Sequence, residues 1–123
     1  MYEYNAEIVR VYDGDTIRVN IDLGFGLTIN NTAIRLKGIN TPEIRGEEKE
    51  QGYASRDRLA AILTSANFKC KIKTTKGKER GKYGRILGEV YVGSDEKGWN
   101  NVNQQLLEEG YAVAYMVDKK AKQ

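Results

Sequence analysis

The sequence predicts an α+β protein built around a small five-stranded β-barrel. Three observations support this prediction: short segments alternate apolar and polar residues, one longer segment spaces its apolar residues as a helix does, and turn residues separate the segments. The 123 residues suffice for one domain with a core of its own. No repeat, linker or low-complexity stretch divides residues 1–123.

The first three strands are expected to form a meander. Residues 7–11 alternate weakly and residues 16–21 alternate clearly, with an Asp-Gly pair at 13–14 between them. Such a pair is a strong signal for a hairpin. A glycine-containing stretch at residues 22–27 then predicts a long connection to a third strand at residues 28–37.

A helix is predicted at residues 47–65. One of its faces carries four residues at helical spacing: Ser55, Leu59, Ile62 and Leu63. Gly52 is expected to weaken the first turn, because glycine is a poor helix former.

Two further strands and a short helix are predicted after residue 65. The alternation at residues 68–74 puts Cys70 on the buried face, where its thiol is expected to be inert. Residues 86–92 form the fifth strand, and an asparagine at 100–101 caps a short helix that Gly110 ends.

A last extended stretch is predicted at residues 111–117. Five strands with a helix between the third and the fourth is the element order of an OB-fold, a Greek-key barrel that commonly binds oligonucleotides. Other small β-barrels share this order, so the order alone does not decide the function.

The composition excludes several kinds of catalysis. The chain has no histidine and a single cysteine, which rules out serine–histidine and cysteine–histidine triads, histidine-based nucleases, a structural zinc site and an internal disulfide. Carboxylates, arginine, lysine, tyrosine and an oxygen-liganded metal remain for catalysis.

No segment indicates a membrane span or a secretion signal. No apolar run is long enough to cross a bilayer, and residues 1–5 have neither the basic flank nor the apolar stretch of a signal peptide. The sequence leaves the compartment open: cytoplasmic, or secreted and already processed. Nothing in it calls for an obligate protein partner.

Positive charge is concentrated in one segment. The formal net charge is only +3, but residues 69–85 carry eight basic residues against one acid, Glu79. A run of charge is usually a solvated face, yet one this one-sided is also what a phosphate backbone attracts.

Residues 34–43 place an arginine and a carboxylate where phosphate chemistry would need them. Arg35 lies on the predicted third strand, and Pro42 stiffens the chain immediately before Glu43. A guanidinium and a carboxylate held near each other can bind a phosphodiester and activate a water beside it. Asp15, at the edge of the hairpin turn, is a candidate metal ligand.

Each of these motifs alone has an ordinary structural explanation. Residues 13–16 are typical of a hairpin turn, Arg35 of an outward-facing strand arginine, residues 40–43 of a turn, and residues 82–85 of a loop before a strand. Together they supply a ligand for a hard metal, two arginines and a carboxylate on one small barrel.

In combination, these motifs resemble the staphylococcal nuclease (thermonuclease) family. The matching segments follow the family's order and spacing: residues 11–16, 34–36, 40–43, 52–55, 82–85 and 110–115. Each segment is common, whereas the combination is highly specific and covers nearly the whole chain from residue 7 to 115.

The resemblance implies a calcium-dependent nuclease that acts on DNA and RNA and leaves 3′-phosphate and 5′-hydroxyl ends. It implies three sets of residues: Arg35, Glu43 and Arg85 for catalysis; Lys82, Tyr83 and Tyr115 for nucleotide binding; and Asp15, Asn40 and the Thr41 carbonyl for calcium. The arginines would hold the scissile phosphate, and Glu43 would activate the attacking water. Because tyrosine faces stack on unpaired bases, single strands are expected to be preferred.

Two departures from the family pattern modify these expectations. The family usually has aspartate where this chain has Asn40, and an asparagine oxygen brings no charge, so a weaker or less selective metal site is expected. The family commonly continues into a further helix, whereas this chain ends with residues 118–123. That helix is expected to be missing, from a shortened chain or a minimal form.

Two other functions compete with the nuclease. A catalytically inactive OB-fold module would bind single-stranded nucleic acid, but such domains usually lack the arginines or the glutamate that this chain has. A barrel used only for protein interaction would leave the basic run unexplained. Cleavage of a labelled single strand, retention without cleavage, or neither would distinguish the three.

Overall fold

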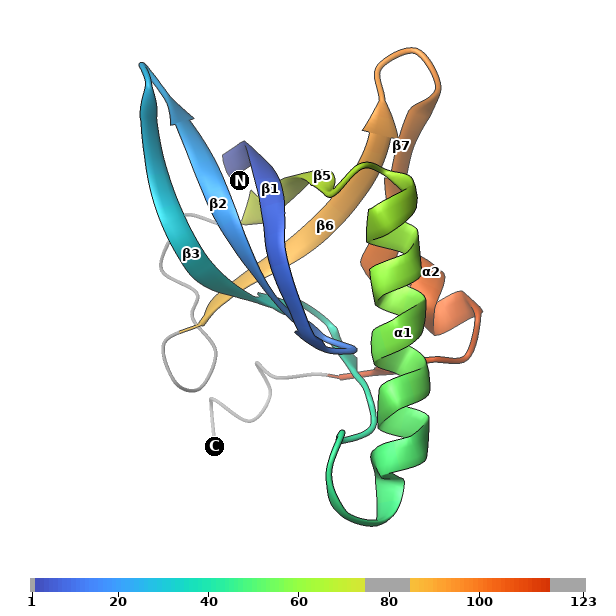
Figure 1. Ribbon diagram of the computed structural model, residues 1–123. Helices are drawn as coiled ribbons and strands as arrows, with labels where there is room; N and C mark the ends of the chain where they lie inside the picture. The colour runs from blue at the N-terminus through green and yellow to red at the C-terminus, as the bar shows by residue number, and fades with distance from the viewer. Residues whose placement is uncertain (1, 75–84, 116–123) are drawn as a thin grey trace, which may run out of the picture.

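A β-barrel flanked by two helices forms the protein (Figure 1). The computed structural model describes residues 2–74 and 85–115. Its elements are β1 (Tyr2–Asp13), β2 (Thr16–Gly24), β3 (Leu27–Leu36), β4 (Ile39–Asn40), the 3₁₀ turn η1 (Gly46–Glu48), α1 (Lys49–Ser65), β5 (Lys69–Thr74), β6 (Ile86–Ser94), β7 (Gly98–Asn101), α2 (Val102–Glu108) and β8 (Val113–Ala114).

Five strands close the barrel, which confirms the predicted five-stranded OB-like architecture. The sheet order is β3-β2-β1-β5-β6, and every pairing in this series is antiparallel. The ring closes where β3 and β6 run parallel, with Ile34 beside Ile86 and Leu36 beside Gly88. Residues 69–74 are a strand, as the alternation predicted.

The core lies between the barrel and the two helices, which Figure 1 shows side by side along one flank. It is built from the alternating face of the strands and one face of each helix, and its fully buried members include Ile17, Val19, Ile34, Leu36, Leu59, Leu63, Val90 and Leu106. Cys70 is buried with them, as predicted. Burial raises the pKa of its thiol to about 12, so the thiol stays protonated and unreactive.

A buried asparagine on α2 supports the closure of the barrel. The side chain of Asn103 accepts a hydrogen bond from the Val90 amide (3.1 Å) and donates one to the Lys37 carbonyl (2.9 Å). It therefore ties α2 both to β6 and to the residue that follows β3. The predicted cap of α2 is Asn101, whose side chain accepts from the Gln104 amide.

The predicted long connection between the second and third strands is wrong. β2 continues to Gly24 and β3 begins at Leu27, so only Phe25 and Gly26 form the turn. Both have positive φ, 56° and 77°, the combination that a type I′ hairpin turn uses. Gly24 and Gly26, which indicated a loop, instead allow a tight turn.

Two short strands, β4 and β7, escape the sequence pattern, and a third, β8, lies within the extended stretch that was predicted. β4 and β8 pair with each other, and β7 extends the sheet at β6. Strands of two to four residues are too short to show a clear alternation, so no local pattern reveals β4 or β7. Of the extended stretch predicted at residues 111–117, the structure forms strand only at β8, and residues 116–117 lie outside the described part. No helix in residues 2–74 and 85–115 is long and apolar enough to span a membrane.

Candidate active site

The turn between β1 and β2 is packed inside the protein. Asp15, in this turn, is 6% exposed. A Cβ on the preceding residue, Gly14, would lie 2.8 Å from the Thr41 hydroxyl oxygen and 2.8 Å from the Ser55 Cβ. Real Cβ atoms do not come so close, so glycine lets this turn pack between α1 and the segment after β4.

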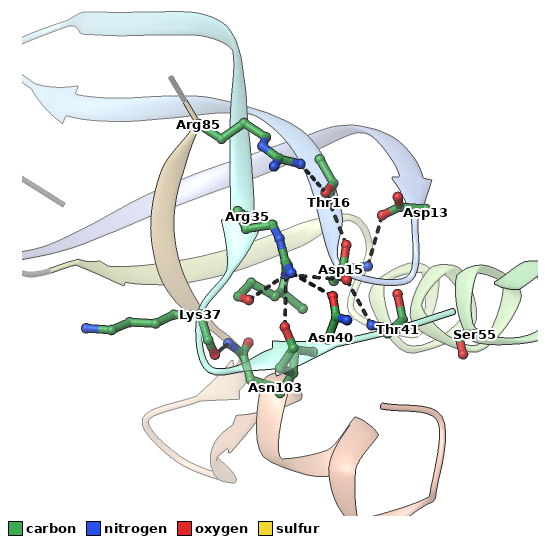
Figure 2. Close-up of polar contacts among 12 residues, drawn as sticks. Asp13, Asp15, Thr16, Arg35, Lys37, Asn40, Thr41, Ser55, Arg85 and Asn103 are labelled. Carbon is green, nitrogen blue, oxygen red and sulfur yellow. Dashed lines mark hydrogen bonds and ion pairs between the residues drawn. The ribbon is translucent and has the colours of Figure 1, made fainter. Parts of the chain in front are cut away.

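The carboxylate of Asp15 is the centre of a hydrogen-bonded group (Figure 2). Its Oδ2 accepts from the backbone N–H of Thr41 (2.9 Å) and lies 3.4 Å from Nη1 of Arg35. Its Oδ1 accepts from the hydroxyl of Thr16 (3.3 Å). Three of the residues predicted for the metal and the phosphate are thereby brought together: Asp15, Arg35 and Thr41.

Arg35 points into this group and is held firmly in place. Its Nη1 donates to the carbonyls of Leu36 (3.1 Å) and Ile39 (3.0 Å), and its Nη2 donates to Oδ1 of Asn40 (3.0 Å). The side chain is only 11% exposed. Within the described residues, Nε–H of Arg35 has no acceptor, and this donor belongs to an edge of the guanidinium that can pair bidentately with phosphate oxygens.

The second predicted arginine is connected to the same carboxylate through a hydroxyl. Arg85 Nη1 donates to Thr16 Oγ1 (3.3 Å), and the Thr16 hydroxyl in turn donates to Asp15. Both guanidinium groups therefore lie around Asp15, one directly and one through Thr16 (Figure 2). Thr16 lies in the turn motif at residues 13–16, but the sequence alone indicates no role for it.

Asp13 is a second carboxylate that the sequence analysis did not single out. Its Oδ1 accepts from the backbone N–H of Asp15 (3.1 Å). Burial, and next the negative charge of Asp15, raise the pKa of Asp13 to about 6. The only signal in the sequence was its place in the Asp-Gly-Asp turn.

Tyr115 lies beside Arg35, as its predicted role requires. The pairing of β8 with β4 brings the C-terminal segment to the site, and the Tyr115 amide donates to the Gly38 carbonyl (2.9 Å). The ring centroid is 5.8 Å from Cζ of Arg35, and the residue is 40% exposed. An exposed ring next to a guanidinium that is predicted to bind phosphate is placed where it could meet a base.

Glu43 is close in sequence to this group, but the structure does not join its carboxylate to it. Its side chain is exposed and makes no hydrogen bond or ion pair with any residue in 2–74 or 85–115. Its backbone N–H donates to Oε1 of Glu48 (3.1 Å). The role of Glu43 in catalysis stays a prediction.

The other predicted nucleic-acid contacts are only partly within the described residues. Lys82 and Tyr83 lie outside the described residues. In the basic run, Lys69, Lys71 and Lys73 stand on β5 opposite Glu7, Asn5 and Glu3 of β1. Lys71 forms a 3.0 Å ion pair with Glu3. The acids of β1 therefore offset part of the charge that the sequence showed as one-sided.

The oxygen atoms near Arg35 suit a hard cation. In the part of the chain that the structure describes, no three His, Cys, Asp or Glu side chains cluster as a metal site. A cation here would depend on one carboxylate, that of Asp15, with the neutral oxygens of Asn40 and Thr41. Asp15 and Asn40 lie within reach of one guanidinium, so their oxygens converge. Such a donor set fits calcium with modest affinity.

Comparison with known proteins identifies related nucleases. Residues 33–123 match the family model described as staphylococcal nuclease homologue. The chain is 32% identical over 117 residues to micrococcal nuclease of Shigella flexneri, covering 92% of this chain and 59% of that protein. It is 32% identical over 124 residues to endonuclease YhcR of Bacillus subtilis (94% and 9%) and 34% identical over 122 residues to endonuclease YncB of the same species (96% and 52%). The chain therefore spans less than two thirds of the length of these relatives.

Proposed function

Because this chain belongs to the staphylococcal nuclease family, we propose that it is a nuclease that hydrolyses phosphodiester bonds of DNA and RNA. One observation carries the proposal: the guanidinium groups of Arg35 and Arg85 are both held around the buried carboxylate of Asp15. This group lies beside an exposed tyrosine, Tyr115, where a polymer can pass.

The two arginines would stabilise the transition state. Attack on a phosphodiester builds negative charge on the equatorial oxygens, and a guanidinium edge matches that geometry with two parallel hydrogen bonds. Arg35 is already fixed by two backbone carbonyls and by Asn40, so little reorganisation is needed when charge develops. One preorganised donor of this kind is typically worth about 3 kcal/mol.

Glu43 would act as the general base. Its carboxylate takes a proton from water as the water oxygen bonds to phosphorus, and the bond from phosphorus to the 5′ oxygen breaks. The 5′ oxygen takes up a proton from solvent, which leaves a 5′-hydroxyl and a 3′-phosphate. A positioned base contributes roughly 10²–10⁴-fold to the rate.

Calcium is the proposed cofactor, held by Asp15, Asn40 and the Thr41 carbonyl. When bound, a hard divalent cation supplies positive charge for the phosphoryl oxygens. The chain's own part is to hold Asp15 in place through the Thr41 amide and the Thr16 hydroxyl. Because Asn40 adds no charge, other hard cations are expected to substitute more readily than in a site with two carboxylates.

Single strands are the proposed substrate form. Tyr115 offers an exposed ring beside Arg35, and a base can stack on it only when unpaired, for about 1–3 kcal/mol. Phosphate contacts through arginine make binding fall as salt rises. The same physics favours Lys82 and Tyr83 as further nucleotide contacts.

The test is cleavage of end-labelled oligonucleotides, single-stranded and duplex, with calcium or with a chelator. Calcium-dependent cleavage that is faster for single strands, with 3′-phosphate ends on the products, would support the proposal. Salt-dependent binding without cleavage would instead favour a non-catalytic nucleic-acid-binding module. Absence of both would reject the proposed function.

A further inference from the structure

Both polar groups of the Glu43 backbone, the N–H and the carbonyl, contact residues of η1 and of the first turn of α1. On one side, the Glu43 N–H donates to Oε1 of Glu48, the last residue of η1, at 3.1 Å. On the other side, the Glu43 carbonyl packs against Gly52 of α1. These contacts come from residues that no part of the proposed mechanism uses.

Gly52 allows this contact because it has no side chain. The residue is buried, and a Cβ built on it would overlap the Glu43 carbonyl and lie 2.9 Å from Cα of Ile44. The expectation that Gly52 merely weakens the helix therefore misses its main role. At this position glycine lets α1 approach the chain that carries Glu43, although alanine would favour the helix by about 1 kcal/mol.

Glu48 also lies near the segment that carries Asn40 and Thr41. It lines a cavity of about 230 Å³ together with Asn40, Thr41 and Pro42 on one side and residues 110–113 on the other. The Glu48 carboxylate accepts its hydrogen bond from the Glu43 amide beside this cavity. The hydrogen bond therefore joins the end of the segment 40–43 to the beginning of α1, across the short loop between them.

We propose that Glu48 and Gly52 are positioning residues that hold the backbone of Glu43 and so aim its carboxylate. The inference rests on the proposed nuclease function, since it assigns Glu43 a catalytic carboxylate to be aimed. The exposed Glu43 side chain forms no hydrogen bond or ion pair among the described residues, so its direction depends largely on how its backbone is held. Glu48 acts as a hydrogen-bond acceptor in this arrangement, not through its charge.

The matched variants are Glu48→Ala, Glu48→Gln and the control Glu47→Ala, all in the full chain. Glutamine keeps an acceptor oxygen and loses the charge, whereas alanine loses both. Glu47 is the neighbouring exposed acid of η1 and forms no hydrogen bond with Glu43. Amide hydrogen exchange of Glu43, measured by NMR without substrate, should become about five- to tenfold faster in Glu48→Ala and stay near the parent rate in the other two.

Kinetics on a single-stranded oligonucleotide provide the second measurement. Glu48→Ala should lower kcat roughly tenfold to hundredfold, because small displacements of a catalytic group are costly, with KM within about twofold of the parent. Glu48→Gln should restore kcat, and Gly52→Ala should lower it without raising KM. Calcium affinity should be unchanged in all of them.

The outcomes separate the possible failures. If Glu48→Gln behaves like Glu48→Ala, or if Glu48→Ala keeps the parent's exchange rate and kcat, the positioning role is wrong. Weaker calcium binding in Glu48→Gln would make Glu48 a metal ligand and also overturn the inference. If the parent itself does not cleave, the proposed function fails, while hydrogen exchange still reports whether Glu48 holds the Glu43 amide.

Discussion

The guanidinium of Arg35 binds the side-chain oxygen of Asn40 at 3.0 Å, and the same guanidinium lies 3.4 Å from the carboxylate of Asp15. A cation bound by Asp15 and Asn40 would therefore have one charged and one neutral side-chain oxygen as ligands. Arg35 already orients both of these oxygens. Compared with an aspartate at the same position, Asn40 leaves this site with one negative charge fewer.

Asn40→Asp should tighten calcium binding, by roughly tenfold, because it adds a second carboxylate to the donor set. Calorimetric titration of the variant and the parent measures the change. Asn30→Asp, on the exposed part of β3, is the matched control for net charge and should leave the affinity unaltered. Equal or weaker binding by Asn40→Asp would show that residue 40 does not ligate the metal.

Glu43→Gln should lower kcat by roughly 10²–10⁴, since it removes the general base and keeps the size of the side chain. Oligonucleotide affinity, measured by fluorescence anisotropy, should stay within about twofold because binding depends on the cationic side chains. Glu47→Gln is a control that removes an acid from the adjoining turn. Cleavage by Glu43→Gln at the parent rate would make Glu43 a turn residue only.

Arg35→Lys should damage both stability and turnover. Lysine keeps the positive charge but cannot supply the hydrogen bonds to Leu36, Ile39 and Asn40 together, so buried acceptors lose partners. The loss should be about 2 kcal/mol in the free energy of unfolding. Urea denaturation tests this, and Arg18→Lys, at an exposed strand arginine, should change stability much less. An Arg35→Lys variant as stable as the parent would contradict the role of these contacts.

Glu109→Gln should make the protein less sensitive to acid. Two hydrogen bonds from Arg58 (2.6 and 2.9 Å) lower the pKa of Glu109 to about 2, below its ordinary value of 4.5. As the pH falls, Glu109 is protonated in the unfolded chain at a higher pH than in the folded protein. The stabilisation by this pair is therefore complete above about pH 5 and is lost toward pH 2.

Both side chains of this pair are about one third exposed, 36% and 31%, so solvent screening keeps the effect small and salt-dependent. Denaturation midpoints at pH 6 and at pH 3 measure it. The parent should exceed Glu109→Gln in stability at pH 6, and the difference should shrink at pH 3. If the stability difference between the parent and Glu109→Gln were larger at pH 3 than at pH 6, the pKa of Glu109 would be raised on folding and not lowered.

The sequence by itself determined the alternating strands and the main helix, and it supplied the candidate residues for the site. Alternation and helical spacing are local, because they follow from the geometry of one strand or one helix. They correctly place Ile17 and Ile34 in the core, and Leu59 on the face of α1 that covers it. The absence of histidine likewise limited the chemistry without any structure.

Only the tertiary structure decided which of those residues meet. Asp15 and Arg35 approach because Thr16 pairs with Arg35 across β2 and β3, and Tyr115 joins them through the pairing of β8 with β4. The bond from Glu43 to Glu48 depends in the same way on where α1 begins. These contacts follow from strand register, barrel closure and helix packing, which are set by the whole core, so no local pattern in the chain encodes them.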